Sequence, residues 1–238
     1  MTAMLASVRA LDEALLALKL GADLIDLKEP ARGALGALDH AAVRVMVQAM
    51  DRRRPVSATI GDIPSMDPEE MVAAVERMIA TGVDYIKVGF FAGERAFASA
   101  RALAVPARKA RLVAVIFADQ GCDLALVDTL AGAGFAGVML DTARKDGRSL
   151  RDWQGDAQLA SFVRHGRRLG LLTGLAGSLR RQDIAPLLAI APDYLGFRGA
   201  LCRGAARVQV LDEGAFRQIR EAIPADDRSP RRPIAVAA

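Results

Sequence analysis

The chain has 238 residues, of which 52% are hydrophobic and 25% are charged. This size supports one large core or two small ones, and the composition excludes a disordered polypeptide. No run of about 18 apolar residues is free of charges or breaks, which argues against a membrane span. The early Arg9, Asp12 and Glu13 argue against a signal peptide. We therefore expect a cytoplasmic protein that does not bind membranes.

Lysine is rare in this chain. Lys and Arg together number 32, against 28 Asp and Glu, which gives a formal net charge of +4. The only lysines are Lys19, Lys28, Lys87, Lys109 and Lys145. Arginine serves as the general surface cation here, and it cannot replace an amine that has to lose its proton. Each lysine is therefore a candidate for a specific chemical role.

Strand-like apolar segments alternate with helical patterns along the whole chain. Strands are expected near residues 4–8, 23–28, 56–60, 85–88, 112–117, 137–141, 171–175 and 194–198. Helices are expected over residues 11–20, 41–50, 68–80, 94–103, 123–131, 156–168, 181–190 and 213–222. Gly21, Gly82 and Gly134 each come just before a strand, where glycine can end a helix in the left-handed conformation.

This alternation favours a single-domain (β/α)8 barrel, or TIM barrel. The chain of 238 residues is close to the length of about 250 residues that is typical of this fold. An open doubly wound sheet has the same alternation, but it usually has a glycine-rich dinucleotide motif after an early strand, and this chain has none. We predict that the barrel covers residues 1–225 and that residues 226–238 form a basic, mobile tail.

Charged side chains gather at the predicted ends of the strands, where the active sites of such barrels lie. In the second strand Asp26 and Lys28 alternate with apolar residues, so both are expected to point into the barrel mouth. Lys87 is placed in the same way in the fourth strand, and the sixth strand ends at Asp141, with Lys145 in the next loop. A lysine among other cations has its neutral form favoured, which makes it a nucleophile toward carbonyl groups.

The loops after the seventh and eighth strands predict a phosphate site. Gly177 and Ser178 follow the seventh strand, and Arg198 and Gly199 end the eighth. Barrels often bind phosphate with these two loops, through backbone N–H groups that glycine lets a ligand approach closely. Arg198 is expected to add a bidentate contact. Together with the lysines, these residues predict an aldolase or dehydratase that acts on a small phosphorylated carbonyl compound.

Other kinds of site have weaker support. The basic runs at residues 51–54 and 164–168 lack interleaved aromatic residues and lie at predicted helix ends, so we interpret them as solvated charge and expect no nucleic-acid partner. His40 and His165 belong to no metal-ligand spacing, so we expect neither a metal nor another cofactor. No serine at a strand end has a nearby histidine for a hydrolytic triad. A homo-oligomer is compatible with the sequence.

Seven segments carry a resemblance to a known family. They are GADLIDLKEP at 21–30, GALG at 33–36, VSATIGDIP at 56–64, GVDYIKVG at 82–89, MLDTARKDG at 139–147, LAGS at 175–178 and GFRGA at 196–200. In this order they resemble the (5-formylfuran-3-yl)methyl phosphate synthases, also called 4-(hydroxymethyl)-2-furancarboxaldehyde-phosphate synthases. The resemblance extends from the N-terminus to about residue 222.

The resemblance implies a (β/α)8 enzyme of the carbon–oxygen lyase type that condenses two molecules of glyceraldehyde 3-phosphate. Phosphate and water are lost, and the furan aldehyde phosphate that forms serves methanofuran-type cofactor synthesis in one-carbon metabolism. It also implies that Lys28 forms a Schiff base, that Lys87 transfers protons, and that Asp26, Asp141 and Lys145 support them. Two alternatives stay open: another Schiff-base aldolase or phosphosugar isomerase, and a non-catalytic barrel that binds an anionic metabolite.

Overall fold

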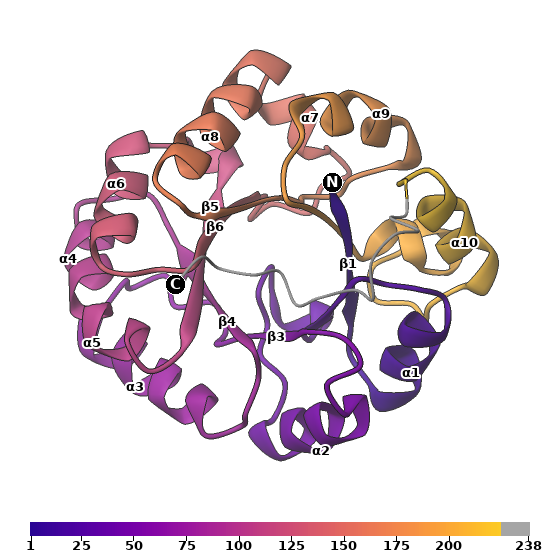
Figure 1. Ribbon diagram of the computed structural model, residues 1–238, viewed down its shortest axis with the longest axis horizontal. Helices are drawn as coiled ribbons and strands as arrows, with labels where there is room; N and C mark the ends of the chain where they lie inside the picture. Colours follow the sequence, from indigo (N-terminus) through magenta and orange to yellow (C-terminus); the bar gives the residue numbers. More distant parts are fainter. Residues whose placement is uncertain (225–238) are drawn as a thin grey trace.

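The apolar runs of the sequence form the parallel strands of a closed barrel. A computed structural model describes residues 1–224, and in it helices surround the barrel on all sides (Figure 1). Each strand pairs with its sequence neighbours, and β1 closes the ring by pairing with β8. The strands are β1 (Ala3–Val8), β2 (Leu24–Leu27), β3 (Val56–Thr59), β4 (Tyr85–Phe90), β5 (Arg111–Phe117), β6 (Gly137–Asp141), β7 (Leu172–Leu175) and β8 (Tyr194–Phe197).

The predicted (β/α)8 barrel is thus confirmed. The predicted tail, residues 226–238, lies outside the described residues, as does residue 225 of the predicted domain. Among residues 1–224, no helix combines the length and the apolar character that crossing a membrane would require.

Several helices begin at an aspartate that caps the first turn. Asp39, Asp67, Asp123 and Asp212 each accept a hydrogen bond from a backbone N–H of the first turn that follows. The helices are α1 (Leu11–Lys19), α2 (His40–Met50), α3 (Pro68–Ile79), α4 (Arg95–Ala102), α5 (Ala104–Ala107), α6 (Leu124–Gly132), α7 (Leu150–Trp153), α8 (Asp156–Arg168), α9 (Arg181–Ile190) and α10 (Glu213–Glu221).

Short elements in the connecting segments were not predicted, because a single turn leaves no apolar period to detect. They are the helices α5 and α7 and the 3-10 turns η1 (Pro30–Arg32), η2 (Ala118–Gln120), η3 (Gly199–Leu201) and η4 (Arg203–Ala205). The predicted left-handed glycines are confirmed, with φ of 85° at Gly21, 80° at Gly82 and 85° at Gly134.

Alternation along the strands produces two separate apolar regions. Ile25 and Leu27 of β2 point outward and join the core between the sheet and the helices. Leu24 points inward and belongs to the packing inside the barrel. The other large members of this interior cluster are Leu5, Leu35, Tyr85, Val113, Val115, Phe117, Met139 and Tyr194. The interior is therefore filled by side chains, and polar groups lie above them toward one end.

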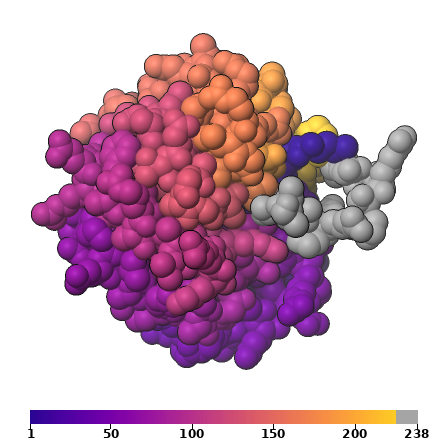
Figure 2. Space-filling view, turned by 60° about the vertical axis from the view of Figure 1, so that its left-hand side comes forward, coloured from indigo at the N-terminus to yellow at the C-terminus, as the bar shows by residue number. Residues whose placement is uncertain are grey.

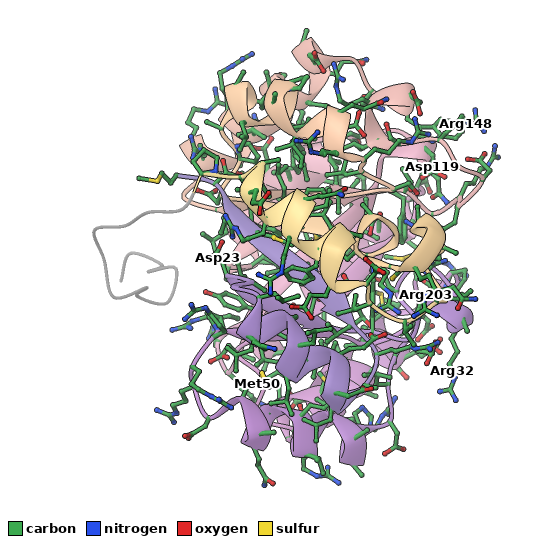
Figure 3. All side chains as sticks on the ribbon, turned by 90° about the vertical axis from the view of Figure 1, so that its right-hand side faces the viewer. Asp23, Arg32, Met50, Asp119, Arg148 and Arg203 are labelled. Carbon is green, nitrogen blue, oxygen red and sulfur yellow. The ribbon has the colours of Figure 1, made fainter. Side chains whose placement is uncertain are left out.

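That end is the mouth formed by the loops that follow the strands. Figure 3 shows Asp119, Arg148 and Arg203 at one end of the barrel and Asp23 at the other. The first three residues follow β5, β6 and β8, whereas Asp23 precedes β2. Figure 2 shows the N-terminal residues and the last described residues on the same side of the molecule.

Candidate active site

A cavity of about 890 Å³ opens at this mouth. Its volume lies in the upper part of the range of about 300–1,000 Å³ that is usual for small-molecule sites. Residues predicted from several strands line it together, namely Lys28, Lys87, Asp141, Lys145, Gly177, Ser178, Arg198 and Gly199. Asp26 lies directly against Lys87. The structure therefore brings all the predicted site residues into one region.

Asp26 is held as a buried carboxylate by three donors. The register pairs it with Ser7 of β1 and Ser57 of β3. The hydroxyl of Ser7 donates to Oδ2 at 2.8 Å, and that of Ser57 donates to Oδ1 at 2.7 Å. Lys87 Nζ lies 2.9 Å from Oδ1. Burial opposes ionisation of Asp26, but Lys87, Lys28 and the Ser57 hydrogen bond together hold its pKa below the usual value.

Asp141 and Lys145 form a second pair at the end of β6. Lys145 Nζ lies 2.8 Å from Asp141 Oδ1 and also donates to Thr142 Oγ1 at 3.2 Å. The backbone N–H of Thr142 donates to the same carboxylate oxygen at 2.7 Å. Burial again opposes ionisation, but Lys145 and Lys28 outweigh it and lower the pKa of Asp141 to about 2. This carboxylate is therefore ionised at neutral pH.

Lys28 differs from the other two lysines of the cavity. Its side chain is buried, and within residues 1–224 its amine has neither a hydrogen bond nor an ion pair. Burial lowers the pKa of Lys28 to about 8, although Asp141 and Asp26 nearby favour the charged form. A useful fraction of this amine is neutral near pH 7 to 8, and a neutral amine is the nucleophilic form.

The loop after β2 begins at Lys28 and is held from two sides. On one side Asp62, in the loop after β3, accepts the backbone N–H of Leu35 at 3.2 Å. On the other side Arg207 Nη2 donates to the carbonyl of Gly33 at 2.6 Å. Gly33 has φ +116°, and a Cβ there would lie 1.9 Å from Asp62 Oδ2, so only glycine fits. Leu35, which lines the same cavity as Lys28 and Lys87, is thereby held in place.

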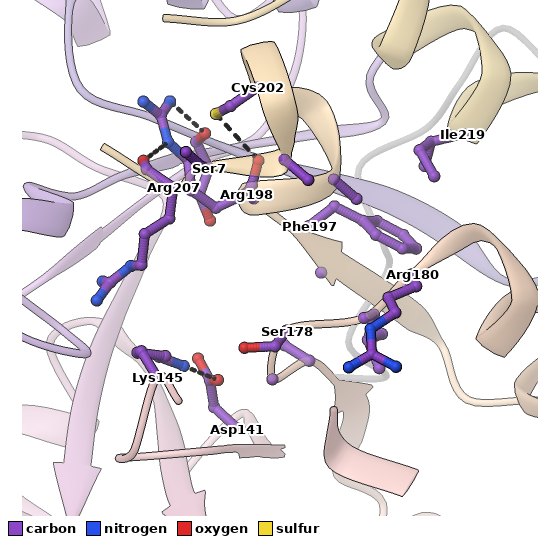
Figure 4. Close-up of a pocket in the computed structure, with 18 of the residues that line it drawn as sticks. Ser7, Asp141, Lys145, Ser178, Arg180, Phe197, Arg198, Cys202, Arg207 and Ile219 are labelled. Atoms are coloured by element: carbon purple, nitrogen blue, oxygen red, sulfur yellow. Dashed lines mark hydrogen bonds and ion pairs between the residues drawn. The ribbon is translucent and has the colours of Figure 1, made fainter. Parts of the chain in front are cut away.

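The loops after β7 and β8 line the cavity but differ in backbone conformation. Gly177 has φ +109°, and a Cβ there would lie 2.9 Å from the Thr142 side chain. Ser178 also has a positive φ, of 48°, and directs its hydroxyl toward the side of the cavity that holds Asp141 (Figure 4). Gly199 is not in the positive region, but a Cβ there would lie 3.1 Å from the carbonyl of Ala205.

The structure corrects the prediction that Arg198 binds phosphate. Its Nη1 and Nη2 bind the buried carboxylate of Glu13 at 2.6 and 3.2 Å. The other N–H groups donate to the carbonyls of Ser7, Arg207 and Gln209. An arginine has five N–H donors, so none is left for a ligand. The expected bidentate contact with phosphate is therefore not available, and Arg198 instead ties α1 to the segment after β8.

Comparisons with known proteins show which family this chain belongs to. The model of the 4-HFC-P synthase family matches residues 4–220. The chain belongs to the 4-HFC-P synthase family. It is 44% identical over 226 residues to a Methylorubrum extorquens protein that carries the name (5-formylfuran-3-yl)methyl phosphate synthase provisionally, with 95% of this chain and 93% of that protein covered.

Two archaeal relatives carry the same synthase name. The (5-formylfuran-3-yl)methyl phosphate synthase of Methanopyrus kandleri is 36% identical over 225 residues, with 89% of this chain and 94% of the relative covered. That of Methanothermobacter thermautotrophicus is 36% identical over 223 residues, with 88% and 94% covered. The resemblance found in the seven segments is confirmed, and the chain is an enzyme of a synthase family.

Solved structures of lower identity confirm the barrel alone. Phosphoribosyl anthranilate isomerase from Thermus thermophilus superposes with a TM-score of 0.66 at 18% identity, covering 93% of this chain and 98% of that one. The 3-hexulose-6-phosphate synthase from Salmonella typhimurium superposes with a TM-score of 0.65 at 16% identity and the same coverage.

The sequence reasoning assigned no role to Asp62 or Arg207, although Arg207 lines the cavity and Asp62 holds the loop after β2. Asp62 lies in one of the seven segments, and this was the only feature of the sequence that pointed to a role for it. Arg207 lies in none of them, and it follows β8 by ten residues in a segment without periodicity. In the described part of the chain, no group of three or more metal-ligating side chains is arranged to hold a metal ion.

Proposed function

We propose that this protein is a (5-formylfuran-3-yl)methyl phosphate synthase that joins two molecules of glyceraldehyde 3-phosphate through a Schiff base on Lys28. The observation that carries the proposal is the contrast among the three lysines of the cavity. Lys87 and Lys145 each bind a carboxylate at 2.9 and 2.8 Å. Lys28 is buried without such a partner in residues 1–224, and its pKa is lowered to about 8.

The first step is attack of the neutral Lys28 amine on the aldehyde carbon of one substrate molecule. Water leaves, and the protonated imine that results acidifies the neighbouring C–H group. Lys87 then exchanges protons with that carbon, and Asp26 stabilises its charged form. The resulting enamine carbon attacks the carbonyl carbon of the second substrate molecule, and this forms the carbon–carbon bond.

The remaining steps remove phosphate and water and close the furan ring. In total, two molecules of glyceraldehyde 3-phosphate yield one (5-formylfuran-3-yl)methyl phosphate, one phosphate and two water molecules. Hydrolysis of the imine returns Lys28 to its starting state. The charged amine of Lys145 lies in the same cavity and is suited to stabilise negative charge on the departing groups.

The phosphate that stays on the first substrate molecule is assigned to the loops after β7 and β8. Gly177 and Gly199 leave backbone exposed to the cavity, and Ser178 supplies a hydroxyl donor. These loops line the same cavity as Lys28. The product fits a role in methanofuran-type cofactor synthesis.

The test is incubation of the protein with glyceraldehyde 3-phosphate, with and without borohydride. We expect a furan aldehyde, seen by ultraviolet absorbance and product mass, and covalent mass on the Lys28 peptide after reduction. Another Schiff-base aldolase would give the covalent mass without a furan product. An isomerase or a metabolite-binding barrel would give neither, and that result would refute the proposal.

A further inference from the structure

Arg207 brings a cation without an acidic partner into the cavity. It is half-buried, lines the cavity, and extends from the loop after β8 toward Lys145 and Asp141 (Figure 4). One of its N–H groups donates to the carbonyl of Gly33 at 2.6 Å. Among the residues that the structure describes, the rest of the guanidinium has no hydrogen-bond partner, and no carboxylate lies within ion-pair distance. Four of its five donors are thus available.

The backbone that carries Arg207 is held so that this side chain enters the cavity. Arg198 Nε donates to the carbonyl of Arg207 at 2.8 Å, and Arg198 Nη2 donates to that of Gln209 at 2.7 Å. Between them, the carbonyl of Val208 accepts from Arg9 Nη1 at 2.8 Å. Three consecutive carbonyls are therefore bound by two arginines, which fixes the direction in which Arg207 points.

The charge balance of the cavity favours an anion beside Arg207. The charges of Asp26 and Asp141 are already matched by Lys87 and Lys145. Asp141 and Asp62 favour the charged form of Arg207 from a longer distance, but among residues 1–224 no carboxylate lies within ion-pair distance of it. Partial burial lowers the pKa of its guanidinium, which shows the cost of removing this charge from water. A phosphate that accepts two parallel N–H bonds from the guanidinium would offset that cost.

We propose that Arg207 binds the phosphate of the second substrate molecule, in a subsite between the loops after β8 and β2. This subsite shares the loop after β8 with Gly199, but it is distinct from the part of the first phosphate site at Gly177 and Ser178, which belongs to the loop after β7. The inference rests on the proposed function, because a reaction between two phosphorylated molecules brings two phosphate groups into one cavity. The bond from Arg207 to Gly33 also ties the second subsite to the loop that begins beside Lys28.

The first test counts phosphate sites by calorimetric titration of the full chain with inorganic phosphate. We expect two phosphates per chain for the wild type and one for Arg207→Gln. The matched control is Arg203→Gln, which removes an equal charge from an exposed arginine of the same loop that does not line the cavity. This control is expected to bind two. Equal phosphate binding by the two variants would overturn the assignment.

The second test separates the two substrate molecules. Arg207→Gln should still give covalent mass on Lys28 after borohydride, because the first molecule does not use Arg207. Its KM for furan formation should rise about ten- to a hundredfold, as expected for loss of a charge-assisted contact. Loss of the covalent mass together with phosphate binding would place Arg207 in the first molecule's site and overturn the proposal.

A third variant keeps the proposal testable if Arg207→Gln does not fold. Arg207→Lys keeps the charge but not the two parallel donors, so its affinity for the second phosphate should fall between those of the wild type and Arg207→Gln. Equal affinity in all three proteins would contradict the assignment. If the wild type makes no furan product but loses one phosphate site on substitution of Arg207, the proposed function fails and the second anion site stands.

Discussion

Lys87 Nζ lies 2.9 Å from Asp26 Oδ1, and only 4% and 1% of the two side chains are exposed. A buried ion pair loses the hydration of both charges, so it persists only where further hydrogen bonds compensate. Ser7 and Ser57 supply those bonds from the two neighbouring strands. The pair and the two hydroxyls therefore form one buried polar cluster built from β1, β2, β3 and β4, and both of its charges affect the pKa of Lys28.

Replacement of Lys28 by arginine should abolish turnover while the fold is kept. Guanidinium preserves the charge but does not form an imine at neutral pH. The rate of furan formation should fall by several orders of magnitude, and borohydride should leave no covalent mass on the protein. The control is Lys109→Arg, at an exposed lysine paired with Glu76, which should keep wild-type activity. A Lys28→Arg rate above about a tenth of wild type would exclude the Schiff-base role.

Lys87→Met should separate imine formation from proton transfer. Product formation should fall by about 10²- to 10⁴-fold, the usual contribution of a positioned acid or base. Covalent mass on Lys28 should still appear after borohydride. The variant should also lose about 3–5 kcal/mol of stability, because Asp26 keeps its buried charge without its closest cation. Rate measurements should therefore be made well below the melting temperature, and loss of labelling at Lys28 would reverse the roles of the two lysines.

The rate of imine formation should rise with pH and level off above about 8, the pKa of Lys28. Below that pH the amine is protonated and unreactive, and above it the neutral nucleophile predominates. Asp141 favours the charged form of Lys28, so Asp141→Asn should move the midpoint of the profile to lower pH. Single-turnover samples quenched with borohydride measure both profiles. A wild-type midpoint near the ordinary lysine value of 10.5, or a shift to higher pH in Asp141→Asn, would contradict this account.

Arg198→Met should destabilise the fold through Glu13. The two side chains form an ion pair in which each is only 5% exposed, so the single substitution leaves a buried carboxylate without its main partner. We expect a loss of about 3–5 kcal/mol in the free energy of unfolding, measured with urea. Adding Glu13→Gln removes the unpaired buried charge and should recover most of the lost stability. An unchanged stability in Arg198→Met would mean that the pair does not hold α1 to the segment after β8.

Gly177→Ala should cost more stability than Gly170→Ala. Both glycines have positive φ, of 109° and 76°, but only at Gly177 would a Cβ meet a neighbour, at 2.9 Å from Thr142. We expect losses of about 1–2 kcal/mol at Gly170 and about 2–4 kcal/mol at Gly177, measured by urea unfolding. Equal losses at the two positions would show that the loop after β7 yields to the added methyl group.

Local pattern alone was enough to predict the barrel and the inward lysines. Period-2 alternation places Asp26 opposite Ile25 and Leu27 whatever the neighbouring strands are. The same holds for Lys87 between Ile86 and Val88, and the structure puts the apolar residues of both strands in the outer core. Whether a side chain of a strand points inward or outward depends only on the residues of that strand, so it can be predicted without any contact that is distant in sequence.

Only the tertiary structure decided which charged groups have partners. Arg198 is occupied by Glu13, which lies 185 residues earlier in the chain. Arg207 reaches Gly33, 174 residues away, and has no carboxylate of its own within residues 1–224. An ion pair acts over a few ångströms, and barrel closure sets which distant segments come that close. The sequence alone therefore favoured Arg198 as the phosphate ligand, and the folded chain leaves Arg207 available instead.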